Sequence, residues 1–168
     1  PLITITRSSQ VQMTFEGVTL PAETFVFSTP ISELEFMAVR IGTVTPEKPV
    51  LVRMHQSCMI SDLFNFGRPS GKLQIDQSLR RIFSERCGVF VLMQNKNDSL
   101  CRCFDGTFAP LQPETKHVGP TPETNYGLGC QVLKALGVGK IRLLTNSEQK
   151  FQGIRAYGLE VVERVPIG

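Results

Sequence analysis

Residues 73–93 read LQIDQSLRRIFSERCGVFVLM, and within them the spacing of the apolar residues changes from that of a helix to that of a strand. Four apolar side chains recur at i, i+4, i+7 and i+8, namely Ile75, Leu79, Ile82 and Phe83. This spacing predicts an amphipathic helix over residues 73–86, ended by Gly88. Residues 89–93 are a continuous apolar run, which is typical of a buried strand in a parallel sheet.

The residues before this helix favour strands. Large apolar side chains recur at every second position in residues 11–15, 25–27 and 37–41, and residues 50–55 form another β-rich run. A period of two is that of a strand with one buried face. We therefore predict that the first half of the chain forms an antiparallel meander or a small barrel.

After residue 120, segments with the residue pattern of a helix alternate with segments that have the pattern of a strand. Thr121 followed by Pro122 is typical of a helix start. We expect helices over residues 122–136 and from residue 146 or 147 to before Gly158, with strands over residues 140–145 and 159–165.

Together these patterns predict an α+β or α/β fold, in which a β-rich N-terminal half packs beside a helix-strand α/β layer. We expect a single domain over residues 1–168, with residues 1–20 as an arm or linker. Residues 99–120 show no period and contain three prolines, so an irregular loop is expected there.

Composition and charge exclude several classes of protein. With 41% hydrophobic residues and 11 phenylalanines among 168 residues, the chain has enough apolar side chains to fold. Its net charge is only +3 and the basic residues are scattered, which argues against nucleic-acid binding. No apolar run reaches the ~18 residues of a membrane span. Five irregularly spaced cysteines do not form a secreted disulfide framework, so a reducing, cytoplasmic location is expected.

Several short motifs carry a family resemblance. The C-terminal part contains NYGLG (125–129), LGV (136–138), IRLLTN (141–146) and YGLEVVERVP (157–166). Upstream, PVLVRMH (49–55) is followed by Cys58 and Asp62, and LRRI (79–82) falls in register. From about residue 25 to the end, residues 99–120 excepted, the chain resembles GTP cyclohydrolase II. The resemblance implies a dimeric enzyme that opens the imidazole ring of GTP, releasing formate and pyrophosphate, in the first committed step of riboflavin synthesis.

The family holds a catalytic zinc ion with three cysteines in the pattern C-x10-C-x-C. Here Cys58 matches the first, but the other two positions are Pro69 and Gly71, and neither residue can bind a metal. We therefore expect no zinc. A relocated site built from Cys58, Cys101 and Cys103, with His55 or His117, is the weaker alternative, because C-x-C alone is a poor metal signal.

The family's catalytic positions are also changed. Its catalytic Asp and Arg fall on Pro122 and Thr124, and neither residue can replace their chemistry. The family segment R-Q-E-G-R-G, which grips the substrate, falls on residues 93–98, where only Gln94 agrees. We therefore assign no catalytic residue and expect the chain to be inactive in GTP ring opening.

Several positions that match the family's substrate contacts are retained, and their side chains suit a phosphate or a guanine nucleotide. These candidate binding residues are Arg53, His55, Gln74, Thr145 and Lys150.

The resulting hypothesis is a GTP cyclohydrolase II-like domain of riboflavin biosynthesis that acts as a structural or regulatory module. By resemblance to bifunctional riboflavin proteins, it would be a homodimer and the C-terminal part of a fusion with a 3,4-dihydroxy-2-butanone 4-phosphate synthase domain. Two alternatives stay open: an enzyme with altered nucleotide chemistry, and an active GTP cyclohydrolase II with a displaced metal site.

Overall fold

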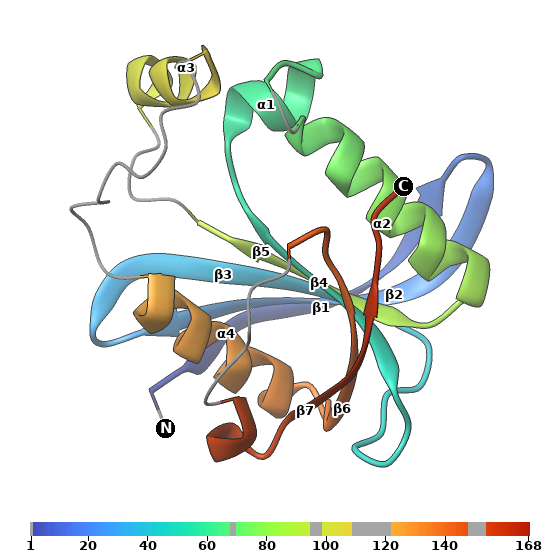
Figure 1. Cartoon of the computed structure of the whole chain (residues 1–168). Helices are drawn as coiled ribbons and strands as arrows, with labels where there is room; N and C mark the ends of the chain where they lie inside the picture. Colours follow the sequence, from blue (N-terminus) through green and yellow to red (C-terminus); the bar gives the residue numbers. More distant parts are fainter. Residues whose placement is uncertain (1, 68–69, 95–98, 109–121, 148–153) are drawn as a thin grey trace.

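The computed structural model describes residues 2–67, 70–94, 99–108, 122–147 and 154–168, and it contains one seven-stranded sheet (Figure 1). In the order of the chain the strands are β1 (Thr4–Phe15), β2 (Val18–Thr29), β3 (Ser32–Ile41), β4 (Val50–Gln56), β5 (Gly88–Met93), β6 (Lys140–Leu144) and β7 (Glu160–Val165). The helices are α1 (Met59–Phe64), α2 (Gly71–Glu85), α3 (Leu100–Phe108), α4 (Pro122–Ala135) and the short 3-10 helix η1 (Ile154–Tyr157).

The strand order across the sheet is β1-β2-β3-β5-β4-β6-β7. Strands β1, β2 and β3 form the predicted antiparallel meander, and β3 pairs antiparallel with β5. Strands β5, β4, β6 and β7 are parallel, so helices must connect them. The predicted α+β or α/β class is confirmed, and the β-rich half and the helix-strand half share one continuous sheet.

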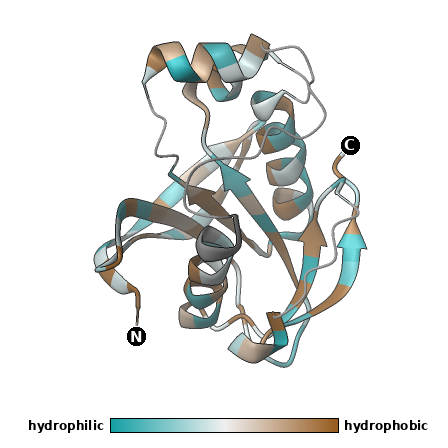
Figure 2. Cartoon of the chain, turned by 60° about the vertical axis from the view of Figure 1, so that its left-hand side comes forward, coloured by the Kyte–Doolittle hydropathy of each residue, from teal (hydrophilic) through white to brown (hydrophobic). Residues whose placement is uncertain are grey.

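Apolar clusters lie on both faces of this sheet. On one face α4 covers the sheet, with Leu133 and Leu136 packed in a cluster that contains Phe27. On the other face α2 packs Ile82 and Phe83 against the sheet. Figure 2 shows hydrophobic colouring along much of the sheet and alternating colours along the helices. Burial on both faces explains why β4 and β5 are rich in apolar residues.

Helix α2 confirms the helix predicted from residue spacing. At its start the Ser70 hydroxyl accepts a hydrogen bond from the Leu73 N–H, and at its end Arg86 adopts a left-handed conformation with φ 55°. Gly88 then begins β5 directly against the helix. A Cβ atom at Gly88 would lie 2.8 Å from Cγ1 of Ile82, so only glycine allows this close approach.

Two expectations about irregular segments are wrong. Residues 4–20 are not an arm or linker, because they form β1 and the start of β2, and Met13 and Phe15 pack against the α2 side of the core. Residues 100–108 are not a loop but helix α3, with apolar residues at i, i+4 and i+8. Residues 109–120 of the expected loop lie outside the described residues.

The other boundaries agree with the sequence patterns where the structure describes them. Helix α4 and strands β6 and β7 lie at the predicted places. Of the helix expected from residue 146 or 147, those two residues are described and are not helical, residues 148–153 lie outside the described residues, and the end is the short 3-10 helix η1. Within the described part of the chain, no helix has the length and apolarity needed to cross a membrane.

Candidate functional site

Arg53 joins three elements near the carboxyl ends of the parallel strands. It lies on β4, and its Nη1 donates a hydrogen bond of 3.1 Å to the backbone carbonyl of Leu144 at the end of β6. Its Nη2 donates a 3.3 Å hydrogen bond to Oε1 of Gln74, in the first turns of α2. The carboxyl end of parallel strands is where open α/β sheets bind ligands. Two predicted binding residues, Arg53 and Gln74, are therefore in direct contact at the expected edge.

The Arg53 side chain is partly buried. Burial lowers the pKa of Arg53 from its ordinary value. Its Nε is buried and has no hydrogen-bond partner among the residues that the structure describes. A partly desolvated cation with a spare donor attracts anions more strongly than a fully solvated one. The same burial restricts how closely a ligand can approach this nitrogen.

Thr145 follows β6 immediately, one residue beyond the carbonyl that Arg53 contacts. Its backbone N–H donates to the carbonyl of Val165 at 3.0 Å, and its Oγ1 accepts a 3.0 Å hydrogen bond from the Ser147 N–H. The hydroxyl thus orders the turn after the strand. Lys150, the fifth predicted binding residue, lies outside the described residues.

His55 lies on the same face of β4 as Arg53, because the two residues are two positions apart. It is 3% exposed, and its Nε2 lies 2.8 Å from Oδ1 of Asp62. The other Asp62 oxygen accepts a 2.9 Å hydrogen bond from the Cys58 N–H. The imidazole also packs on Phe90 at a centroid distance of 6.0 Å, and Nδ1 is buried without a partner in the described part of the chain. The His55 side chain therefore pairs with Asp62 and does not join Arg53 and Gln74.

The Asp62 carboxylate fills the space beside Gly71, the first residue of α2. A Cβ atom at Gly71 would overlap Oδ1 of Asp62 and would lie 3.1 Å from Oγ of Ser61. The Gly71 N–H donates a 2.7 Å hydrogen bond to the same Ser61 hydroxyl. In this packing, a side chain at position 71 would have to displace the Asp62 carboxylate.

Cys58 and Cys103 meet between α1 and α3. The Cys58 Sγ lies 3.5 Å from Oγ1 of Thr107, and the Cys103 Sγ accepts a hydrogen bond from the Ile60 N–H at 3.5 Å. Burial raises the pKa of Cys58, but hydrogen bonds from Cys103, the Ser61 backbone and Thr107 outweigh it, so the net shift is downward. For Cys103, burial and the hydrogen bond with Cys58 both raise the pKa.

Within the described residues this pair lacks a third metal ligand. Cys101, the third thiol of the relocated-site alternative, is exposed on α3. Pro69 and His117 lie outside the described residues. Among the residues that are described, no three His, Cys, Asp or Glu side chains come close enough to hold a metal ion.

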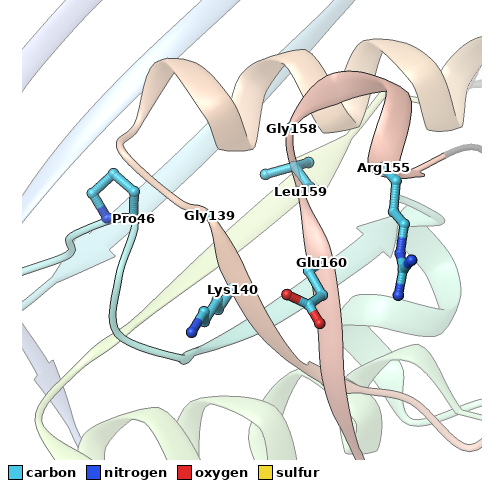
Figure 3. A pocket seen from close by; sticks show the side chains of 7 residues that line it. All are labelled: Pro46, Gly139, Lys140, Arg155, Gly158, Leu159 and Glu160. Carbon is cyan, nitrogen blue, oxygen red and sulfur yellow. The ribbon is translucent and has the colours of Figure 1, made fainter.

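A surface concavity of about 480 Å³ lies at the opposite end of the strands. Figure 3 shows it at the amino ends of β6 and β7, with the charged side chains of Lys140, Arg155 and Glu160. None of the residues predicted from the sequence lines this concavity. The candidate site therefore stays with Arg53 and Gln74.

Sequence reasoning missed the residues that link these groups. Asp62 was part of a quoted motif, but its contact with His55 depends on how α1 folds back onto β4. Thr107 and Ser61 carried no signal in the sequence. Their hydroxyls matter because they bridge α1 to α3 and to α2.

Comparisons with known proteins give consistent results. The family model described as GTP cyclohydrolase II matches residues 7–166. The riboflavin biosynthesis protein RibBA of Bacillus cytotoxicus is 33% identical over 180 residues, covering 99% of this chain and 45% of that protein. RibBA of Parabacteroides distasonis is 36% identical over 142 residues, covering 80% of this chain and 35% of that protein. The chain thus spans less than half the length of these relatives.

A solved structure has a similar fold. It is RibBX from A. baumannii, described as a two-domain 3,4-dihydroxy-2-butanone 4-phosphate synthase. The TM-score is 0.50 at 16% sequence identity, and the match covers 99% of this chain and 40% of that chain. At this identity the likeness concerns the fold alone.

Proposed function

The chain belongs to the GTP cyclohydrolase II family, as its motifs predicted, and we propose that it serves riboflavin biosynthesis as a domain that has lost zinc binding and GTP ring opening. The observation that carries this proposal is the packing of Asp62 against Gly71, the position where the family has a zinc cysteine. A side chain restored at this position would have to displace the partner of His55.

The zinc ion that the family implies does not fit the residues present. A catalytic zinc needs three protein ligands and an open position. Cys58 is the only one of the three family ligands that remains, and its neighbouring thiol, Cys103, supplies at most a second. We therefore assign no chemistry to a metal, and no residue of this chain to a catalytic step.

The remaining site would bind an anion rather than transform it. Arg53 supplies a partly buried positive charge, Gln74 lies against it, and Thr145 follows the neighbouring strand. The ligand we propose is a phosphate or a guanine nucleotide, held also by Lys150. Because His55 is engaged by Asp62 and the family's Glu is missing, we expect a dissociation constant no better than about 10–100 μM.

We further propose that this domain is a structural or regulatory module fused to a 3,4-dihydroxy-2-butanone 4-phosphate synthase domain in the cytoplasm. The support is that RibBA relatives are more than twice as long as the matched region. All five cysteines are free, which agrees with a reducing compartment.

The proposal includes a homodimer. Four phenylalanines form an exposed phenylalanine cluster on α1, α3 and the residues after α1: Phe64, Phe66, Phe104 and Phe108. The ring centroids lie 5.9 Å apart for Phe64 and Phe66, 5.7 Å for Phe66 and Phe108, and 4.6 Å for Phe104 and Phe108. With each ring about half exposed, the cluster presents roughly 400 Å² of apolar surface, a size that often marks an interaction site. Light scattering during gel filtration tests this: a dimer that Phe104→Ser converts to monomer is expected, and a wild-type monomer contradicts it.

Zinc content and formate release together test the loss of activity. Protein purified without chelator should hold no stoichiometric zinc and should release no formate from GTP, with or without added zinc. Zinc bound at one ion per chain, and lost in Cys58→Ser and Cys103→Ser, would favour the displaced metal site. Conversion of GTP to a product without formate would favour the altered enzyme.

Calorimetric titration with GTP and pyrophosphate tests the anion site. Gln74→Leu should weaken binding, whereas Gln77→Leu on the same helix serves as the matched control and should not. Higher salt should also weaken binding, because it screens the charge attraction. If neither ligand gives heat at millimolar concentration, the binding site is absent and only a structural role remains.

A further inference from the structure

Two cysteines from separate elements lie at the junction of α1 and α3, and the sulfur of each contacts the other's element. Cys58 precedes α1 and is half-buried, whereas Cys103 lies on the inner side of α3 and is 9% exposed. The Cys58 Sγ lies 3.5 Å from Oγ1 of Thr107, one turn along α3 from Cys103, and the same hydroxyl donates a 2.8 Å hydrogen bond to the backbone carbonyl of Cys103. The Ile60 N–H fixes the Cys103 sulfur from the other side at 3.5 Å.

From this geometry we propose that Cys58 and Cys103 are a site of reversible thiol oxidation, which reacts with small-molecule disulfides to form a Cys58–Cys103 disulfide. Cys103 lies on helix α3, which packs against α1 (Figure 1). The disulfide would therefore attach α3 covalently to the segment before α1. In a reducing compartment such bonds are transient and respond to redox conditions.

The reaction proceeds in two balanced exchanges. Cys58 is the more accessible sulfur, so its thiolate attacks the reagent, for example oxidised glutathione. One S–S bond forms, the reagent's S–S bond breaks, and one glutathione leaves with the electron pair and a proton. Cys103 then attacks the Cys58 sulfur and releases the second glutathione in the same way. The two cysteines lose two electrons, and the reagent becomes two thiols.

The chain contains its own controls. Cys101 lies on the same helix, two residues from Cys103, but it is exposed. In an unstructured chain Cys101 and Cys103 would pair with Cys58 almost equally well, since the loops have nearly the same length. Cys130 is buried in the core on the α4 face and should not react in the folded protein.

The test is disulfide mapping after incubation of the folded chain with oxidised glutathione and a chelator, followed by alkylation and non-reducing digestion. We expect the Cys58–Cys103 peptide pair to exceed Cys58–Cys101 by at least about tenfold, because the native structure holds the first pair together. The preference should disappear in urea. Cys101→Ser should form the disulfide as the wild type does, whereas Cys103→Ser should accumulate a mixed disulfide at Cys58.

Two results would overturn the proposal. One is a folded wild-type chain that pairs Cys58 with Cys101 as often as with Cys103. The other is a mixed disulfide at Cys58 that persists in the wild type, which would mean that Cys103 cannot reach it.

Discussion

Substitution of Gly71 by alanine should destabilise this protein, although such a change in a helix normally stabilises. Replacing a helical glycine by alanine gains about 0.5–1 kcal/mol. Here the new Cβ would overlap Oδ1 of Asp62 and push the carboxylate away from His55. Losing a hydrogen bond that involves a charged group costs about 1.5–3 kcal/mol. The net loss is about 1–2 kcal/mol, or a melting temperature lower by roughly 2–8 °C for a protein of this size.

A double-mutant cycle separates this effect from a general loss of helix stability. Asp62→Ala alone should destabilise, because it leaves the buried His55 and the Cys58 N–H without their acceptor. In the Asp62→Ala background, Gly71→Ala should become neutral or stabilising, because the overlapping atom is gone. Urea unfolding of the four proteins measures the coupling.

Gly106→Ala provides the matched control, because a Cβ at this helical glycine meets nothing within 4 Å. It should be neutral or stabilising. If Gly71→Ala behaves like Gly106→Ala, or if its cost is unchanged without Asp62, then Asp62 does not occupy the space at position 71. The structural argument against a zinc site would then fail.

Three further outcomes can be measured with the same purified chain. Phe27→Ala should cost about 3–5 kcal/mol in urea unfolding because this ring is fully buried, whereas Ile31→Ala, at 55% exposure, should cost less than about 1 kcal/mol; similar losses for both would contradict the assigned core. Gly88→Ala should destabilise by about 1–3 kcal/mol because its Cβ would press on Ile82, and a stable variant would show that β5 can move away from α2. Cys130 should resist alkylation at pH 8, because burial raises its pKa to about 11 and the thiolate increases only as the pH approaches that value; labelling as fast as that of exposed Cys101 would refute this.

Local patterns in the sequence predicted most of the helices and strands, because period and end signals are local. The helix predicted over residues 73–86 is α2, within about two residues at each end. Helix α3 was missed because Gly106 and two cysteines interrupt a short apolar repeat. The joining of β3 to β5 in one sheet could not be predicted, since it pairs residues about fifty positions apart.

The candidate site was predictable only where family motifs supplied it. Arg53 and Gln74 were chosen separately by resemblance, and the structure places them in contact. The engagement of His55 by Asp62 could not be predicted, because it depends on the turn between β4 and α1. The approach of Cys103 to Cys58 depends in turn on where α3 packs, which no local pattern determines.

The two outer strands of the sheet differ in how they discourage strand addition. Strand β7 carries Glu160, Glu163 and Arg164, and charged side chains on an edge oppose pairing with another chain. Strand β1 is twice as long and has Arg7 as its single charge, with uncharged residues elsewhere, among them Ile5 at 48% and Val11 at 37% exposure. Its outer backbone N–H and C=O groups face no other strand of the described sheet. Intermolecular β-sheet growth, and hence aggregation on partial unfolding, should therefore start at β1, and a lysine at position 10 or 12 is the simplest way to suppress it.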